Sequence, residues 1–497
     1  MSLAKLALKS SLILVITKFS EKTLGLISTL ILARILVPED FGIVAISLLV
    51  IYFMATVSNS GGKEYIVRKD DVDQDDIDTF WTLNICLKVA IYLLVLLLTP
   101  LIVNFYDDNR LQSLLPVLAL SLPIAALVNP ATVICQRELN YIPILKIDVI
   151  RKLVSITIAI SIAIYFESYW ALIWSHLASN ITHVLCSYIF LKYSPSLTLI
   201  NIKKQWGFSQ WMLYRSVLGY CRSQLDTILV SAFYSPSSLG GFHISKYISN
   251  MPATDFFGPA LEPLLASFAR NKDNVDNFKH QITLTVLVIA VTVIPSTAFI
   301  YFNASTIVDL VLGDKWSEYS SLFGVLSLLI IPHSLAYLGS TVMTSMGRVN
   351  VLFYYDLLTL LLMGVVLYLL KERTLEYFTY GKFLVEIFMV TILLLIGNIR
   401  IFKKNTISIF FYLIIPSFLS FTLAYLLGHL VLEVPSFIKL SILFFVFLFC
   451  WVLVCILMFV LFLRQNHSAN HLKHIIMGIL RKCVSLVWNI SPKHKFK

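Results

Sequence analysis

Long apolar stretches follow one another along nearly the whole chain, separated by short polar segments. Each stretch is long enough to cross a hydrocarbon layer of about 30 Å as an α-helix. The stretches are continuous, as in Leu357–Leu370 and Leu440–Leu463, and do not alternate with the period of two that a membrane β-strand requires. Because lipid offers the backbone no hydrogen-bond partner, this pattern predicts a bundle of transmembrane helices.

The sequence therefore predicts an all-α integral membrane protein with about 14 transmembrane helices. Twelve of them are expected to form two six-helix lobes, because a short pattern recurs in the two halves of the chain, as described below. The first lobe would occupy residues 1–200, with helices over 11–33, 42–60, 82–104, 112–133, 147–166 and 170–191. The second would occupy residues 201–400, with helices over 208–232, 241–262, 281–302, 320–343, 355–371 and 377–397. Residues 401–463 would add helices over 407–428 and 439–463, and residues 464–497 an amphipathic cytoplasmic tail.

The distribution of lysine and arginine predicts the orientation of these helices. If the N-terminus is cytoplasmic, most basic residues fall on inner segments, including Arg137, Lys203 and Arg400, and few fall on outer ones. Both termini are then expected in the cytoplasm, on the inner membrane of a bacterium. The net charge of +11 reflects this topology and attraction to anionic lipid headgroups, and no nucleic-acid partner is expected.

Three polar features are expected to have structural roles. The basic start of the chain, with Lys5 and Lys9, resembles a signal peptide, but the apolar stretch that follows is too long and we expect a retained first helix. The acidic joint Gly61–Thr79 is expected to be a solvated cytoplasmic turn, with a cation site as the alternative. The seven cysteines show no disulfide framework or metal-ligand spacing, so no metal or cofactor is expected.

One short pattern occurs twice, about 200 residues apart. Ala33–Gly42 and Ser231–Gly240 both carry proline, a bulky apolar residue and glycine at the same spacing. A looser similarity links Arg137–Asp148 to Arg348–Asp356. Because the matching helices are an even number of crossings apart, the two lobes are expected to be parallel repeats, an arrangement frequent in transporters, with the substrate site between the halves.

Ionisable residues inside the apolar helices are candidates for function, because isolating one there costs at least about 2.5 kcal/mol. The first helix carries Lys18 and Lys22 on one face, beside Glu21. The seventh carries Arg215 and Arg222 on one face, with Asp226 one turn further. Paired cations in a wet cleft suit a multiply charged anion such as pyrophosphate.

Each candidate also has a simpler interpretation. Lys18 and Arg215 could extend to the headgroups, and Arg222 and Asp226 could form an intrahelical pair. Lys246 is a further candidate for substrate binding. His176 and His183 share a face of the sixth helix and could relay protons or simply bond to neighbouring helices. The remaining in-span charges are expected to be local: Lys382 paired with Glu386, and Lys88 extending to the headgroups.

Several short motifs resemble the oligosaccharide-lipid flippases, the polysaccharide transporters of the multidrug/oligosaccharidyl-lipid/polysaccharide exporter superfamily. They follow one another in the order of that family: Leu32–Gly42, Gln136–Leu139, the region of Asp226, Leu239-Gly240, Met251-Pro252 and Gly313–Trp316. The resemblance implies two pseudo-symmetric six-helix lobes around a central cleft, plus two further helices. It also implies transfer of an undecaprenyl-pyrophosphate-linked oligosaccharide to the outer leaflet by alternating access. It implies that basic cleft residues, here Lys18, Lys22, Arg215 and Arg222, meet the pyrophosphate.

Two other functions are open to this sequence. A cation-coupled multidrug exporter of the same superfamily would need carboxylates deep in the first lobe, where Glu21 stands between lysines. A membrane glycosyltransferase or polymerase would need a large outer loop with acid–base or metal-binding residues, and the longest one, Asn303–Glu318, is short. The expected partners are the lipid-linked oligosaccharide, membrane lipids and a polysaccharide polymerase or chain-length regulator.

Overall fold

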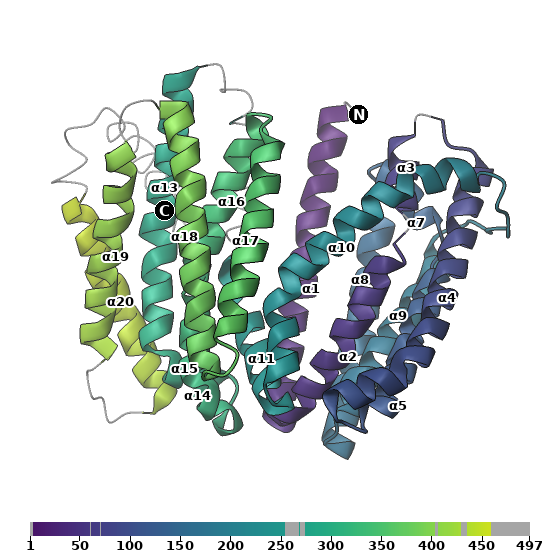
Figure 1. The fold of residues 1–497 in the computed structure, drawn as a ribbon, viewed down its shortest axis with the longest axis horizontal. Helices are drawn as coiled ribbons and strands as arrows, with labels where there is room; N and C mark the ends of the chain where they lie inside the picture. The colour runs from purple at the N-terminus through teal and green to yellow at the C-terminus, as the bar shows by residue number, and fades with distance from the viewer. Residues whose placement is uncertain are drawn as a thin grey trace, which may run out of the picture. The chain divides into compact units, whose positions relative to one another are not determined.

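A computed structural model describes residues 3–59, 61–69, 71–253, 268, 274–402, 406–428 and 435–458 of the chain, and all regular structure in them is helical (Figure 1). The helices up to residue 251 are α1 (Leu3–Ile35), α2 (Pro38–Val57), α3 (Gly62–Arg68), α4 (Gln74–Tyr106), α5 (Leu111–Ala119), α6 (Ser121–Ala126), α7 (Ala131–Arg137), α8 (Ile142–Phe166), α9 (Trp170–Phe190), α10 (Ile202–Phe233) and α11 (Pro236–Met251). The later ones are α13 (Val275–Phe302), α14 (Ala304–Val311), the 3₁₀ helix η2 (Asp314–Tyr319), α15 (Ser320–Ser327), α16 (Ile330–Ser345), α17 (Val349–Leu369), α18 (Leu375–Phe402), α19 (Thr406–Gly428) and α20 (Ser436–Met458).

By length and apolar composition, eight of the described helical stretches could cross a bilayer, or nine if the bent stretch α5–α7 is one crossing. The predicted number of about 14 transmembrane helices stays a prediction. A helix lies over the described part of each predicted span except 112–133 and 320–343, which are broken into shorter helices. The predicted tail over 464–497 lies outside the described residues.

The helix predicted over 112–133 is not one continuous helix in the structure. The chain there forms α5, α6 and α7, with a bend of 62° between Leu111–Ala126 and Ala131–Arg137. Pro130 stands at the bend, and proline has no N–H to donate to the carbonyl one turn earlier. Pro130 is visible in the sequence, but the apolar residues around it predicted that the helix continues through it.

The chain divides into two compact units. The first comprises Met1–Ser249, Val311–Phe323 and Leu360–Lys382. The second comprises Asn250–Leu310, Gly324–Thr359 and Phe383–Lys497. The predicted lobe boundaries stay predictions.

In the first unit, α8 packs along both α1 and α9, while α2 packs against α4, α5 and α10. The buried residues of α2 include Phe41, Ile43, Ile46 and Ile51. This packing places the polar side chains of α2 and α4 beside those of α10.

The two copies of the repeated turn meet within the first unit. A Cβ atom added to Gly42 would lie 1.7 Å from the carbonyl oxygen of Pro236. A Cβ atom added to Gly240 would lie 1.8 Å from the carbonyl oxygen of Pro38. Because each glycine has no Cβ atom, the backbone at the proline of the other copy can pack directly against it. The first turns of α2 and α11 are therefore in backbone-to-backbone contact.

The turn Gly313–Trp316 closes the end of α1 in the same unit. The buried indole of Trp316 donates its Nε1–H to the carbonyl oxygen of Ala33, 2.7 Å away, and Lys315 Nζ donates to that of Ile35, also at 2.7 Å. The Trp316 ring also stacks edge-on against Phe41, with centroids 5.4 Å apart. These bonds satisfy carbonyls that have no partner at a helix C-terminus.

The acidic joint is not wholly solvated, contrary to the prediction. Asp76 and Asp78 are 0% and 1% exposed. Asp76 pairs with Lys69 and accepts a bond from Asn201, while Asp78 accepts bonds from Tyr193 Oη at 2.7 Å and Ser196 Oγ at 2.6 Å. Burial and the Asp78 carboxylate raise the pKa of the Tyr193 phenol. These carboxylates tie the loop after α9 to the start of α4.

In the second unit, α13 packs against α16, α19 and α20. Its core includes Val286, Val293 and Leu338. Pro295 cannot donate to the carbonyl of Val291 one turn earlier, and the indole Nε1–H of Trp451 on α20 donates to that oxygen at 3.0 Å. A backbone group freed by proline is thus satisfied by a neighbouring helix, as the lack of water in a bilayer demands.

We expect Gly42→Ala and Gly240→Ala to destabilise the protein by about 1–3 kcal/mol or more, because the added methyl overlaps backbone atoms that cannot move aside. The matched control is Gly219→Ala, since a Cβ there meets nothing within 4 Å and alanine favours the helix. The unfolding midpoints are measured by heating the purified variants in detergent and monitoring the loss of the folded peak by size-exclusion chromatography. Equal midpoints for the three variants would contradict the close approach.

Candidate functional site

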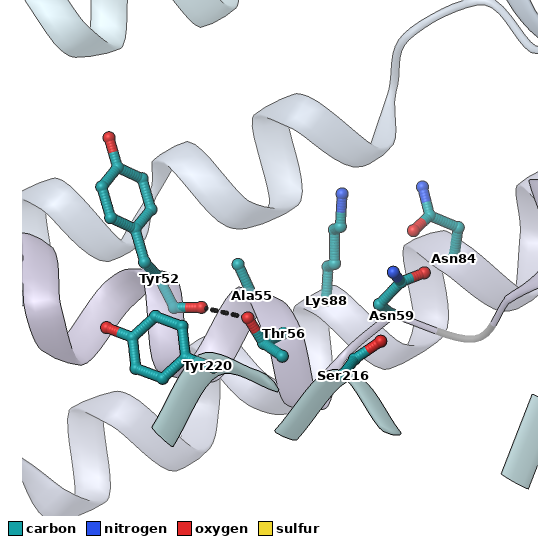
Figure 2. Close-up of a pocket in the computed structure, with 8 residues that line it drawn as sticks. All are labelled: Tyr52, Ala55, Thr56, Asn59, Asn84, Lys88, Ser216 and Tyr220. Carbon is teal, nitrogen blue, oxygen red and sulfur yellow. Dashed lines mark hydrogen bonds between the residues drawn. The ribbon is translucent and has the colours of Figure 1, made fainter. Parts of the chain in front are cut away.

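A polar pocket of about 660 Å³ lies where α2, α4 and α10 meet in the first unit (Figure 2). α2 contributes Tyr52, Ala55 and Thr56, the segment just after it contributes Asn59, α4 contributes Asn84 and Lys88, and α10 contributes Ser216 and Tyr220. In Figure 2 the side chains of Lys88 and Asn84 extend in the same direction, with Asn59 close to both in that view. The Thr56 hydroxyl donates to the Tyr52 carbonyl oxygen at 2.8 Å. The pocket offers one cation, two amides and several hydroxyls.

An apolar pocket of about 610 Å³ lies along the same three helices. Its only shared residue with the polar pocket is Tyr220. It is lined by Leu49, Val50, Phe53 and Met54 of α2, by Leu98, Leu101, Ile102, Phe105 and Tyr106 of α4, and by Tyr220, Cys221 and Ile228 of α10. The two pockets thus form one seam that is polar at one end and apolar at the other.

Lys88 is half-buried and lines the polar pocket, where the sequence led us to expect a side chain extended to the headgroups. Among the residues that the structure describes, no hydrogen-bond acceptor or carboxylate pairs with its ammonium. An unpaired lysine inside a bilayer is costly, up to about 2.5–3.5 kcal/mol at the bilayer centre. Sequence reasoning undervalued Lys88 because it stands alone on its helix, without the paired spacing seen in the first and seventh helices.

Asp226 is a buried carboxylate shared by two lysines. It is 4% exposed, and it accepts bonds from Lys246 Nζ at 2.8 Å and from Lys382 Nζ at 2.7 Å. Lys246 also donates to the Thr227 hydroxyl at 3.0 Å. These bonds join α10, α11 and α18 in one charged group of residues, the Asp226 cluster.

Lys382 bonds Asp226, a partner that the sequence did not indicate, and the expected pair of Lys382 and Glu386 stays a prediction. Within the second unit, Glu386 lies 2.8 Å from the Nε2 atom of His333. The two residues are four apart on α18, so sequence spacing permitted a pair, but each side chain has a partner on another helix.

Glu21 belongs to a second charged cluster, between α1 and α8. Its carboxylate lies 2.7 Å from Arg151 Nη2 and 3.3 Å from the ammonium of Lys18, whose side chain is 64% exposed. The Nε atom of Arg151 lies 2.9 Å from Asp148. The strongest partner of Glu21 is therefore an arginine that the sequence did not single out.

Lys152 follows Arg151 and also faces α1. A Cβ added to Gly25 would lie 3.2 Å from Lys152 Nζ and 3.5 Å from the Tyr247 hydroxyl. Gly25 thus lets side chains of α8 and α11 lie directly against α1. Arg151 and Lys152 lie near one end of a predicted helix. Basic residues at such positions are usually explained by the orientation of the helix in the membrane, so the sequence did not indicate that these two contact α1.

The structure brings together only some of the predicted site residues. Lys246 meets Asp226, and Lys18 meets Glu21, whereas Lys22 and Arg222 are exposed and the Arg215 side chain lies outside the described residues. The His176 ring lies against Tyr52, with centroids 6.3 Å apart, and His183 is partly buried. A single basic cleft and a histidine relay stay predictions.

A family model described as "Polysaccharide biosynthesis protein" matches residues 31–321. Lipopolysaccharide biosynthesis protein WzxC of Escherichia coli (strain K12) is 23% identical, over 67% of this chain and 68% of that protein. Teichuronic acid biosynthesis protein TuaB of Bacillus subtilis (strain 168) is 21% identical, over 64% and 66%. The matches span about two thirds of each relative's length.

Two kinds of solved structure share the fold. Lipid II flippase MurJ, in an inward closed conformation, has a TM-score of 0.70 at 13% identity, covering 88% of this chain and 96% of its own. An inward-facing MATE family multidrug resistance transporter has a TM-score of 0.57 at 14% identity, covering 78% and 98%. At these identities the likeness concerns the fold alone, and it confirms the predicted all-helical, multi-pass membrane architecture.

The matched segment 31–321 includes every residue that lines the two pockets of the seam, together with Asp226 and Lys246. It covers more than half of the chain, and the resemblance expected from the short motifs is confirmed. The chain belongs to the polysaccharide biosynthesis protein family.

Proposed function

We propose that this protein moves an oligosaccharide linked to undecaprenyl pyrophosphate from the cytoplasmic to the outer leaflet of the bacterial inner membrane, for the synthesis of a surface polysaccharide. Family membership over residues 31–321 carries the proposal. The relatives are named for lipopolysaccharide and teichuronic acid biosynthesis, and a structural neighbour is named a lipid II flippase. These names concern glycans and lipid-linked glycans, which favours that substrate class here.

The physical task is to carry a multiply charged head through a layer where isolated charge is expensive. No covalent bond needs to break. Fixed cations and hydroxyls can replace the water around the head and lower the barrier, while rocking of two repeats exposes the head to each side in turn. Lys18, Lys22, Arg215 and Arg222 are our candidates for contacts with the pyrophosphate.

The Asp226 cluster supports an anionic substrate. At the side chain, Lys246 is 20% exposed and Lys382 is 7% exposed, so Lys246 is the more accessible of the two lysines. The shared carboxylate lowers the cost of keeping two lysines in an apolar bundle, and the more exposed Lys246 is a basic group that an anionic head could contact.

The finer features of the proposal come from the sequence. The lysine and arginine distribution supports cytoplasmic termini and an inner-membrane location. A polysaccharide polymerase or chain-length regulator on the outer side would receive the transferred glycan. The lipids of the surrounding membrane are the remaining partner in the proposal.

A cation-coupled multidrug exporter is the second candidate, favoured only by the shared fold with a MATE transporter. Such a protein would need carboxylates available to a cation. In the described first unit, Glu21, Asp148 and Asp226 each already lie against arginine or lysine. The family match and the paired carboxylates both favour the glycan lipid.

A glycosyltransferase or polymerase is disfavoured because the named relatives include a succinoglycan biosynthesis transport protein and a structural neighbour is a flippase. The longest predicted outer loop, Asn303–Glu318, is also not a free loop that could carry a catalytic site. It contains α14 and the turn whose Lys315 and Trp316 bond to the end of α1.

Replacing both Lys22 and Arg222 by alanine is expected to reduce glycan-lipid transfer at least about tenfold, because hydrogen bonds to a charged group contribute about 1.5–3 kcal/mol each. Transfer is measured in liposomes with a fluorescent lipid-linked oligosaccharide, and membrane insertion by fractionation. The exposed Lys192→Ala variant is the control. Native transfer rates in the correctly inserted double variant would remove the basic-residue proposal.

Replacing Asp226 by asparagine removes the carboxylate to which Lys246 and Lys382 both bond, and we expect a loss of about 3–5 kcal/mol in stability. The added change Lys382→Met removes one of the two lysine charges and should restore much of the loss. Thermal unfolding in detergent compares the native protein with the two variants. An unaltered midpoint for Asp226→Asn would show that the cluster does not hold α10, α11 and α18 together.

A further inference from the structure

The seam between α2, α4 and α10 changes from polar to apolar along one direction. On α4, Asn84 and Lys88 line the polar pocket, while Leu98, Leu101 and Phe105 line the apolar one. At a rise of 1.5 Å per residue, the step from Lys88 to Leu98 is about 15 Å. The seam is therefore amphiphilic over a distance comparable to half the hydrocarbon layer.

The polar pocket suits an anionic head that also carries hydroxyl groups. Lys88 has no ion-pair or hydrogen-bond partner within the described part of the chain, so its ammonium can bind an anion without first breaking a pair. Asn59 and Asn84 can both donate and accept, as sugar hydroxyls require, and Ser216 adds a hydroxyl from α10. At about 660 Å³ the pocket is far larger than one phosphate group needs.

The apolar pocket suits a hydrocarbon chain. Leu101 and Phe105 are 64% and 67% exposed, so its wall on α4 is open on the outside of the helices. A lipid tail could lie there with its outer side still in the bilayer. The lining supplies apolar contact and no charged group.

Hydrogen bonds fix the walls of the seam before any ligand arrives. The Tyr220 phenol donates to the Leu49 carbonyl oxygen at 2.7 Å, which joins α10 to α2. Tyr106 Oη and Ser231 Oγ lie 3.0 Å apart and join α4 to α10. Tyr220 therefore holds a fixed position between the two pockets, and a preformed groove reduces the ordering cost of binding.

We propose that this seam is the loading site for one isoprenoid lipid bearing a phosphate or pyrophosphate, with the anion on Lys88 and the chain in the apolar pocket. The assignment rests on the proposed function, whose substrate class it shares. The polar end lies toward the N-terminal end of α4, which the basic-residue distribution assigns to the cytoplasmic side. The seam thus holds the lipid as it stands in the inner leaflet, before transfer.

The seam fits an isoprenoid glycan lipid better than a bulk phospholipid. It is a single groove between three helices, which accommodates one chain, whereas a phospholipid has two. Its head end offers two amides, Asn59 and Asn84, and the phenol faces of Tyr52 and Tyr220, groups that bind sugars more readily than they bind a glycerol phosphate.

The test measures lipid binding to the purified full chain by native mass spectrometry. The probes are undecaprenyl phosphate, uncharged undecaprenol and phosphatidylglycerol. We expect undecaprenyl phosphate to bind at least about tenfold more tightly than either other lipid. Lys88→Met should abolish its advantage over undecaprenol, Lys88→Arg should retain it, and Leu98→Trp, which fills the apolar pocket, should weaken both isoprenoids.

The matched control is Lys146→Met, which makes the same change at a lysine of α8 that lies over the Phe190 ring, away from the seam. Equal binding by the Lys88→Met and Lys146→Met variants would overturn the proposal. Equal affinity for phosphatidylglycerol and undecaprenyl phosphate would overturn it as well, since the seam would then hold bulk lipid.

Transfer of a lipid-linked oligosaccharide is measured separately in liposomes. If the native protein transfers none while Lys88-dependent binding persists, the proposed function fails and the loading site stands. If transfer occurs but binding does not depend on Lys88, the loading site alone fails.

Discussion

The cost of removing charge from water determines how the charged side chains of the first unit are arranged. Hydrocarbon offers an isolated ion no hydrogen bond and no opposite charge. The carboxylates on the apolar helices of this unit are shared with cations: Asp226 with Lys246 and Lys382, Glu21 with Arg151 and Lys18. These bonds connect helices far apart in the sequence. Lys88 has no such partner among the described residues, so its charge is available to a ligand.

Backbone approach is the second constraint on the same unit. The starts of α2 and α11 come so close that a methyl group on Gly42 or Gly240 would overlap the proline turn of the other copy. The short repeated pattern in the sequence therefore corresponds to a reciprocal contact between its two copies. Trp316 and Lys315 complete the junction by bonding the last carbonyls of α1.

Substrate chemistry and lipid environment meet in the seam of α2, α4 and α10. One end offers an ammonium, amides and hydroxyls, the other only apolar contact, and Tyr220 stands between them. A transporter of lipid-linked glycans must bind a charged head and a hydrocarbon chain at once. A single groove with both characters lets the two parts of one molecule bind without leaving the membrane.

The sequence by itself determined the helical membrane class, the positions of most helices and the family, because apolar length and short turn motifs are local properties. It did not reveal the bend at Pro130, the burial of Asp76 and Asp78, or the partners of Lys382 and Glu386. Those features depend on which neighbouring helix supplies the opposite charge or the missing donor. Lys88 shows the same limit, since spacing along one helix cannot tell whether a cation has a partner on another. Pairing across helices is a property of packing, and only the tertiary structure decided it.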